Sequence, residues 1–499
     1  MYLFYGILTA KLIRLSNLKK NLSYYFILSL SQLLFPLISI PYISRVLDPA
    51  GIGKVSFIDS LTWYFITFAE FGIVTYGIRE IAKSNNDPVS LKRLSGELMV
   101  LHIISSAIVL VVYIPVVFLL WYKIGDIRLV FFSLSFFLMS FFSCEWYFVG
   151  KERFWFVAVR NLTTRVFGLI SIFFLIRQQS DYYIYYGIIT CTSIAVICWS
   201  AITLFKEVPL SFRNLEWKKH LRPVFVVFQV TMLSGAMIWC DNILLGFLGG
   251  AVALGYYAFA TKVIRISGAL ITDSLWVLYP RVIALLQQKN QEGFVNTNLQ
   301  SIRLFITLSV PLSIGLFLLA RPFTTLYFGP AFNRVFINIK ILALYPFIKC
   351  YSLYLIKQLL QPFGHDKLVV KGLLAGFIVL VVSMLGLCPL WQDAGASVSL
   401  ILSEIVTAAY FTWWLRKRYA HIQLFDFITL LQAVGASLLF IPVVYITRRI
   451  GIQTLPQFFI MVVACIIVYF VVQLVICRNK LLLQIYRSAL KTIGISKNA

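Results

Sequence analysis

Two cations lie inside a stretch of sequence that is otherwise apolar enough to cross a lipid bilayer. Residues 256–280, YYAFATKVIRISGALITDSLWVLYP, contain Lys262, Arg265 and Asp273. At about 100° per residue, a helix places Lys262 and Arg265 on one face and nearly aligns Asp273 with Lys262. Ionisable groups at membrane depth are costly, and they usually face a cavity or a partner. We therefore expect the two cations to hold an anion such as a phosphate or diphosphate, which arginine binds through paired N–H groups.

Further charged residues fall inside apolar stretches. The cations are Arg160, Arg165, Lys340, Lys349 and Lys357, and the anions are Asp59, Glu70, Glu145, Asp241 and Glu404. Some have a structural alternative, because Lys340 and Lys357 lie near predicted helix ends, where lysine can extend its ammonium to the headgroups. Glu145 and Glu404 can each pair with a neighbouring cation. Arg160 and Arg165 are separated by about 140° on an ideal helix, so we expect them to face different surroundings.

The composition is typical of an integral membrane protein. Of the 499 residues, 60% are hydrophobic and 13% are charged, whereas soluble domains have about 45–50% and 25%. Apolar runs of about 18 residues or more recur without the alternation of a membrane β-barrel, so each predicts a helix that satisfies its own backbone hydrogen bonds. The predicted fold is all-α with about 14 transmembrane helices. Their spans are 21–44, 55–78, 97–120, 128–149, 155–176, 182–205, 223–247, 252–278, 302–320, 337–359, 368–389, 394–415, 427–446 and 457–477.

Lysine and arginine in the loops predict the orientation. With the N-terminus inside, roughly three loop cations lie on the cytoplasmic side for each one on the other side, as the positive-inside rule requires. Both termini are then cytoplasmic. The net charge of +25 follows largely from this topology. Because the basic residues are spread over many loops and form no stripe, we expect no nucleic-acid partner.

The sequence gives little support to catalysis or to a metal. All eight cysteines lie in or at the ends of apolar spans without a CxxC pair, and the four histidines are scattered. Neither a P-loop motif nor a DxD pair is present, and no loop has room for a folded soluble domain of about 50 residues. We therefore expect no metal and no cofactor, and a protein that is not an enzyme.

A repeated segment indicates two lobes. RVLDPAGIGKVSF (45–57) and LGFLGGAVALGYYAF (245–259) each combine a leucine, a glycine-containing turn and Gly-x-x-x-Phe, and each leads into a helix. The alternative is that glycine and alanine mark any helix boundary. The repeat predicts two parallel six-helix lobes with a substrate between them near the membrane midplane. The predicted parts are an interfacial or cytoplasmic segment 1–20, an N-lobe 21–205, a linker 206–222, a C-lobe 223–415, helices in 427–477 and a cytoplasmic tail 478–499.

The sequence resembles a known transporter family. FPLISIPYISRVLDPAGIGKVSF, followed by AEFGIVTYGIREIAK, is similar to the opening of the Wzx-type lipid-linked oligosaccharide flippases, the polysaccharide transporters of the MOP superfamily. EWYFVGKERFWFVAVRNLTTRVFG (145–168), LYPRVIALL (278–286) and LYFGPAFNRVFINIKIL (326–342) extend the resemblance. One departure is Asp48-Pro49, where the family pattern has glycine and then an acidic residue.

The resemblance implies a V-shaped bundle with a cationic lumen. Such a protein moves an undecaprenyl-diphosphate-linked oligosaccharide, such as an O-antigen unit for lipopolysaccharide, from the cytoplasmic to the outer leaflet of the bacterial inner membrane. The resemblance also implies coupling to a proton or sodium gradient, contact with membrane lipids and contact with other polysaccharide assembly proteins in the membrane.

The charged residues receive roles from this resemblance and from their depth. The candidate ligands of the diphosphate and sugar are Lys262, Arg265, Arg160, Arg165 and Lys349. The candidates for ion coupling or charge balance are Asp59, Glu70, Asp241, Asp273 and Glu145.

Two other functions remain as alternatives. A membrane O-antigen polymerase or ligase handles the same lipid-linked sugars, but such proteins have one long external loop, and the longest external loop predicted here has about 16 residues. A multidrug and toxin extruder of the same superfamily exports cations and should have an acidic cavity, which the cations in 256–280 argue against.

Overall fold

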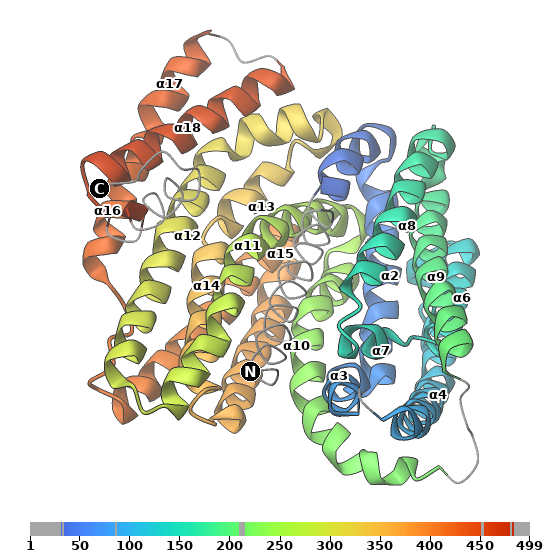
Figure 1. Cartoon of the computed structure of the whole chain (residues 1–499). Helices are drawn as coiled ribbons and strands as arrows, with labels where there is room; N and C mark the ends of the chain where they lie inside the picture. Colours follow the sequence, from blue (N-terminus) through green and yellow to red (C-terminus); the bar gives the residue numbers. More distant parts are fainter. Residues whose placement is uncertain are drawn as a thin grey trace, which may run out of the picture. The chain divides into compact units, whose positions relative to one another are not determined.

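The protein is described by a computed structural model of the 499-residue chain. The structure describes residues 31, 34–84, 87–208, 215–450, 454–479 and 482–483. Throughout these ranges the regular elements are helices (Figure 1). The all-α membrane fold predicted from the sequence is confirmed. The predicted segment 1–20, most of the predicted tail 478–499 and the middle of the linker 206–222 lie outside the described residues.

The chain divides into two compact units, residues 1–243 and 244–499. Unit 1 contains a helix at Leu34–Val46 and most of α10. The α10 helix spans Leu221–Leu248. The other helices of unit 1 are α2 (Pro49–Glu70), α3 (Ile73–Lys83), α4 (Pro88–Leu119), α5 (Trp121–Ile124), α6 (Ile127–Ser140), α7 (Glu145–Gly150), α8 (Phe154–Leu175), η1 (Gln179–Asp181), α9 (Tyr182–Glu207) and η2 (Trp217–His220). Within this unit α9 packs against α6 and α8, and α2 packs against α4, α6 and α9.

Unit 2 begins with the end of α10. Its helices are α11 (Gly250–Gln287), α12 (Gln291–Tyr327), η3 (Pro330–Phe332), α13 (Val335–Leu342), α14 (Tyr345–Tyr354), the π-helix η4 (Leu355–Leu360), α15 (Asp366–Arg418), α16 (Phe427–Leu438), α17 (Phe440–Ile450) and α18 (Leu455–Val475). The α11, α13 and α15 helices pack together, and α16 to α18 pack on α12 through a core that includes Phe440, Met461 and Tyr469. The two predicted helices at 427–446 and 457–477 therefore stack on the outside of α12 (Figure 1).

Eight helices in the described part of the chain are long and apolar enough to cross a membrane, or up to ten if each of two bent pairs is one span. The count of fourteen stays a prediction. One of the eight, α15, has 53 residues and leaves helical geometry at Gln392, which separates the predicted spans 368–389 and 394–415. Helix α11, which carries Lys262 and Arg265, has 38 residues.

The Asp48-Pro49 pair begins α2. The Asp48 carboxylate accepts a hydrogen bond from the Gly51 backbone N–H at 2.9 Å, and Pro49 occupies the first helical position, where its missing N–H costs nothing. A methyl group on Gly51 would lie 2.8 Å from the Asp48 Oδ1 and 2.9 Å from the Tyr182 Cβ. The departure from the family pattern is therefore a helix cap packed against α9.

A sharp break separates α2 from α3. Phe71 and Gly72 both adopt left-handed backbone conformations, with φ of 48° and 77°, and the two helices meet at 43°. A Cβ on Gly72 would lie 2.8 Å from the backbone nitrogen of Phe228 on α10. The sequence Glu-Phe-Gly thus ends α2 at Glu70 and places the Glu70 carboxyl at the break.

Gly72→Ala should destabilise the protein more than Gly125→Ala. Both glycines have positive φ, so alanine costs about 1–2 kcal/mol at either position. A methyl at Gly125 meets only the Lys54 Nζ at 3.7 Å, whereas at Gly72 it collides with backbone. Thermal unfolding of the two variants in the same detergent measures the difference. Equal shifts in the apparent unfolding temperature would contradict the close approach of α10 to this turn.

Candidate binding sites in the two units

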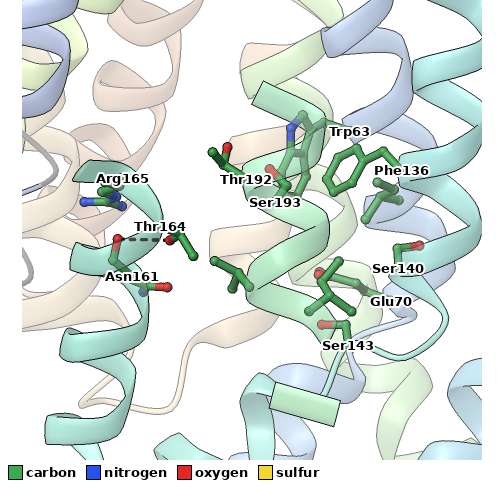
Figure 2. Close-up of a pocket in the computed structure, with 13 residues that line it drawn as sticks. Trp63, Glu70, Phe136, Ser140, Ser143, Asn161, Thr164, Arg165, Thr192 and Ser193 are labelled. Atoms are coloured by element: carbon green, nitrogen blue, oxygen red, sulfur yellow. Dashed lines mark hydrogen bonds between the residues drawn. The ribbon is translucent and has the colours of Figure 1, made fainter. Parts of the chain in front are cut away.

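A cavity of about 290 Å³ lies among α2, α6, α8 and α9 of unit 1 (Figure 2). Each helix contributes one face. The lining residues are Trp63, Ile66 and Glu70 from α2, Phe136 and Ser140 from α6, Ser143 from the segment before α7, Asn161, Thr164 and Arg165 from α8, and Thr192, Ser193, Val196 and Ile197 from α9. These spacings of three, four and seven residues are those that bring side chains to one side of a helix.

The cavity combines polar groups with aromatic rings. Arg165, Asn161 and Thr164 lie together on α8, and Glu70, Ser140 and Ser143 lie together at another part of the lining (Figure 2). The Arg165 Nη1 donates to the Ser31 Oγ at 2.9 Å, and the Thr164 hydroxyl donates to the Asn161 carbonyl at 3.1 Å.

Trp63 supplies the largest aromatic surface of this cavity. Its ring meets Phe136 edge-on at 5.2 Å and stacks on Trp239 at 5.8 Å. A guanidinium, an amide, a carboxyl group and several hydroxyls beside aromatic faces are suited to a polar, hydroxyl-rich or anionic ligand.

Arg160 does not line the cavity. Its side chain is 1% exposed, and its Nη2 forms an ion pair with the Glu145 Oε2 at 2.7 Å. The Ser200 hydroxyl and the Asn161 amide oxygen accept further hydrogen bonds from the same guanidinium. The structure therefore separates the two arginines predicted on α8: Arg165 reaches the cavity, whereas Arg160 and Glu145 join α8 to α7.

Two of the predicted acids lie elsewhere in unit 1. Asp59 interacts electrostatically with the buried hydroxyls of Tyr113 and Tyr186, three turns along α2 from Glu70. Asp241 is buried on α10, where its Oδ1 accepts from the Asn242 backbone N–H at 2.7 Å. The neighbouring residues Asn242 and Ser60 share a hydrogen bond of 2.9 Å, which joins α10 to α2. Glu70 is thus the predicted acid that lines the cavity.

Unit 2 brings together two of the predicted cations. The Lys349 Nζ on α14 forms an ion pair with the Glu404 Oε1 on α15 at 2.7 Å. Arg265 on α11 is close enough to Lys349 to interact with it electrostatically. Lys262, one turn before Arg265, is exposed in this unit, and the side chain of Asp273 lies outside the described part of the structure.

Several residues in these sites were not selected from the sequence. Asn161 and Thr164 share a helix face with Arg165, and this could have been predicted from their spacing in the segment 145–168. Trp63 gave no such signal, because aromatic residues at helical spacing are usually packing or membrane-belt residues. The partner of Glu404 could not be chosen among several cations, since residues 349 and 404 are on different helices.

The fold and sites define a multi-pass membrane protein with ionisable groups at membrane depth. Among solved structures, the fold is similar to that of "Lipid II flippase MurJ, inward closed conformation", with a TM-score of 0.61 and 14% identity over 89% of this chain and 99% of that chain. It is also similar to the "Inward-facing conformation of a multidrug resistance MATE family transporter of the MOP superfamily", with a TM-score of 0.60 and 14% identity over 78% of this chain and 95% of the other.

The sequence comparisons define the family. Residues 18–286 match the family model described as "Polysaccharide biosynthesis protein", and the chain belongs to that family. It is 22% identical to the "Putative O-antigen transporter" of Escherichia coli, over 80% of this chain and 97% of that protein. A protein of the same name from Shigella dysenteriae is 21% identical, over 79% of this chain and 98% of its own length.

Glu145→Gln should destabilise the protein more than Arg165→Gln. The first change leaves the buried Arg160 guanidinium without its carboxylate, which costs about 1–3 kcal/mol of folding free energy. Because Glu145 is partly exposed, we expect a cost near the lower end of this range. The second removes a cation that lines the cavity, and glutamine can still donate to Ser31. Thermal unfolding in detergent compares them. A larger loss for Arg165→Gln would give Arg165 the structural role assigned here to Arg160.

Proposed function

We propose that this protein is a flippase that translocates a lipid-linked oligosaccharide across the membrane for surface polysaccharide biosynthesis. The observation that carries the proposal is the unit 1 cavity, which places Arg165, Asn161 and the Trp63 ring together among apolar helices. A sugar offers hydroxyls to such polar groups and an apolar face to an aromatic ring. Membership of the polysaccharide biosynthesis family supports this ligand class.

The cargo follows from physical requirements. A lipid tail can remain in the bilayer, but a sugar diphosphate cannot cross hydrocarbon, because each unpaired polar group costs several kcal/mol there. The protein must therefore supply polar partners along the path. In our proposal, Arg265 and Lys262 of α11, with Lys349 near Arg265, are the diphosphate ligands in unit 2. The cavity of unit 1 is a separate candidate sugar site lined by Arg165 and Trp63. Arg160 has a supporting role through its pair with Glu145.

The direction and location are part of the same proposal. Two relatives carry the name "Putative O-antigen transporter", which supports an O-antigen precursor as the cargo. The undecaprenyl-diphosphate carrier and the bacterial inner membrane are what the resemblance of the sequence implies. The loop cations favour cytoplasmic termini. Movement from the cytoplasmic to the outer leaflet is the direction that the resemblance of the sequence implies. A proton or sodium gradient is the proposed energy source, and Glu70 in the cavity lining is the best-placed acid for the coupling cation, with Asp59 and Asp241 as further candidates.

The fold alone also fits a multidrug extruder. One structural neighbour carries that description. A cationic drug requires an acidic binding surface, whereas α11 presents Lys262 and Arg265. These cations favour an anionic cargo. The names of the two relatives favour transport of a polysaccharide precursor over a polymerase or ligase reaction.

Loss of the cavity cation or of the α11 cations should abolish export without loss of the protein. Each charge-assisted hydrogen bond contributes about 1.5–3 kcal/mol, so Arg165→Gln and the double change Lys262→Ala with Arg265→Ala should each reduce export by roughly tenfold or more. Arg265→Lys should lose function partly, because an ammonium cannot reproduce the planar fork of arginine. The measurement is complementation of a flippase-deficient strain, with surface polysaccharide and membrane protein level recorded together.

Arg177→Gln is the matched control. Arg177 follows the end of α8, is exposed and donates to the Phe174 carbonyl, so its loss should leave export unchanged. Normal export by the double α11 variant, present at the wild-type level, would reject the diphosphate role of Lys262 and Arg265.

A further inference from the structure

The Lys349–Glu404 ion pair is unequal in its exposure to solvent. Glu404 is 3% exposed, whereas 30% of the Lys349 side chain is accessible. The span that carries Lys349, Val335–Leu360, is also the most enclosed in protein: 61% of its apolar window is buried, against 28–33% for the other long spans described. An anion can therefore reach Lys349 from its open side, while Glu404 holds the ammonium from behind.

The buried carboxylate is only half satisfied. Its Oε1 accepts from Lys349, but among the described residues its Oε2 has no hydrogen-bond partner. Two hydroxyls nearby in the sequence, Ser352 one turn along α14 and Ser403 next to Glu404, are buried and lack partners in the same part of the structure. Buried polar atoms are rarely left unpaired, so such a group requires an explanation. The buried Glu404 carboxylate is thus held by Lys349 through one oxygen and, within the described ranges, keeps an open acceptor on the other.

The surrounding charges make Lys349 part of a cationic group. Arg265 from α11 interacts with Lys349 as a like charge, and Tyr345 and Cys350 from α14 are the titratable neighbours. Lys349 therefore has a second cation as well as the Glu404 carboxylate among its neighbours. A diphosphate carries more negative charge than one carboxylate.

We propose that Glu404 is an internal counter-anion, which neutralises Lys349 from the buried side whenever the diphosphate of the cargo is absent and leaves the open side of Lys349 for the cargo. This inference rests on the proposed flippase function. A carrier must return empty after each delivery, and a buried cation without a counter-charge opposes any step that closes the site from water. Glu404 takes the place of the diphosphate in that return step.

The test separates the loaded step from the empty one. Purified protein is placed in phospholipid vesicles, and a labelled short-chain polyprenyl diphosphate sugar is added to the outer leaflet. Net movement of the labelled lipid to the inner leaflet is measured in vesicles whose inner leaflet contains no lipid-linked sugar. Exchange of labelled for unlabelled lipid is measured in vesicles whose inner leaflet contains unlabelled lipid-linked sugar. Exchange needs no empty return, because the carrier is loaded in both directions.

Glu404→Gln should keep exchange within about twofold of wild type and lower net movement at least about tenfold, since an uncompensated buried charge is strongly unfavourable. It should also bind the labelled lipid several-fold more tightly, because the competing carboxylate is gone. The double change Lys349→Gln with Glu404→Gln removes both charges, so it should recover net movement relative to Glu404→Gln while binding the lipid more weakly than wild type.

Glu292→Gln is the charge-matched control, since Glu292 is exposed in the first turn of α12, and it should leave both rates unchanged. Thermal unfolding verifies that each variant is folded. Equal losses of exchange and net movement in folded Glu404→Gln, or normal net movement, would overturn the counter-anion role. If wild-type protein moves no labelled lipid in either format, the proposed function itself fails, which is a different result from a defect confined to Glu404→Gln.

Discussion

The cost of an ionised side chain at membrane depth is the constraint on which this structure depends. Hydrocarbon offers no hydrogen bonds, so every charge in the spans needs a partner, an opening to water or a cargo. Arg160 meets the requirement internally through Glu145 and Ser200. Lys349 meets it partly, because Glu404 covers one side and the other side stays accessible. Arg165 borders a cavity and donates to the Ser31 hydroxyl.

This gradation separates structural charges from those available to a ligand. The Arg160–Glu145 pair, whose arginine is buried, joins two helices and contributes to stability, and removing Glu145 leaves a buried charge. A half-covered cation can exchange one anion for another, which is what transport of a phosphorylated cargo requires. The backbone also positions a charged group for a ligand. The left-handed turn at Phe71 and Gly72 ends α2 at Glu70, so that the Glu70 carboxyl group lines the cavity.

Much of the fold could be predicted from the sequence, because apolar length and the absence of alternation allow only helices in a bilayer. The sequence also predicts that Lys262, Arg265 and Lys349 lie at membrane depth. Lys349 lies in the apolar span Val335–Leu360, and the depth of Lys262 and Arg265 stays a prediction. The partners of such charges could not be predicted, since the pairs Arg160–Glu145 and Lys349–Glu404 depend on which helices become neighbours. Helical spacing indicated only that Arg160 and Arg165 diverge. The break in α15 at Gln392 had a local signal in the short segment after Pro389.

The most direct test of this account is the head-group selectivity of lipid movement by the wild-type protein in vesicles. Two labelled lipids with the same polyprenyl chain and sugar are compared, one with a diphosphate and one joined without phosphate. If the membrane-depth cations bind the cargo, the diphosphate lipid should cross at least about tenfold faster than the neutral lipid, which is the ratio for about 1.4 kcal/mol of differential binding. Equal rates for the two lipids, or no protein-dependent movement of the diphosphate lipid, would contradict the account.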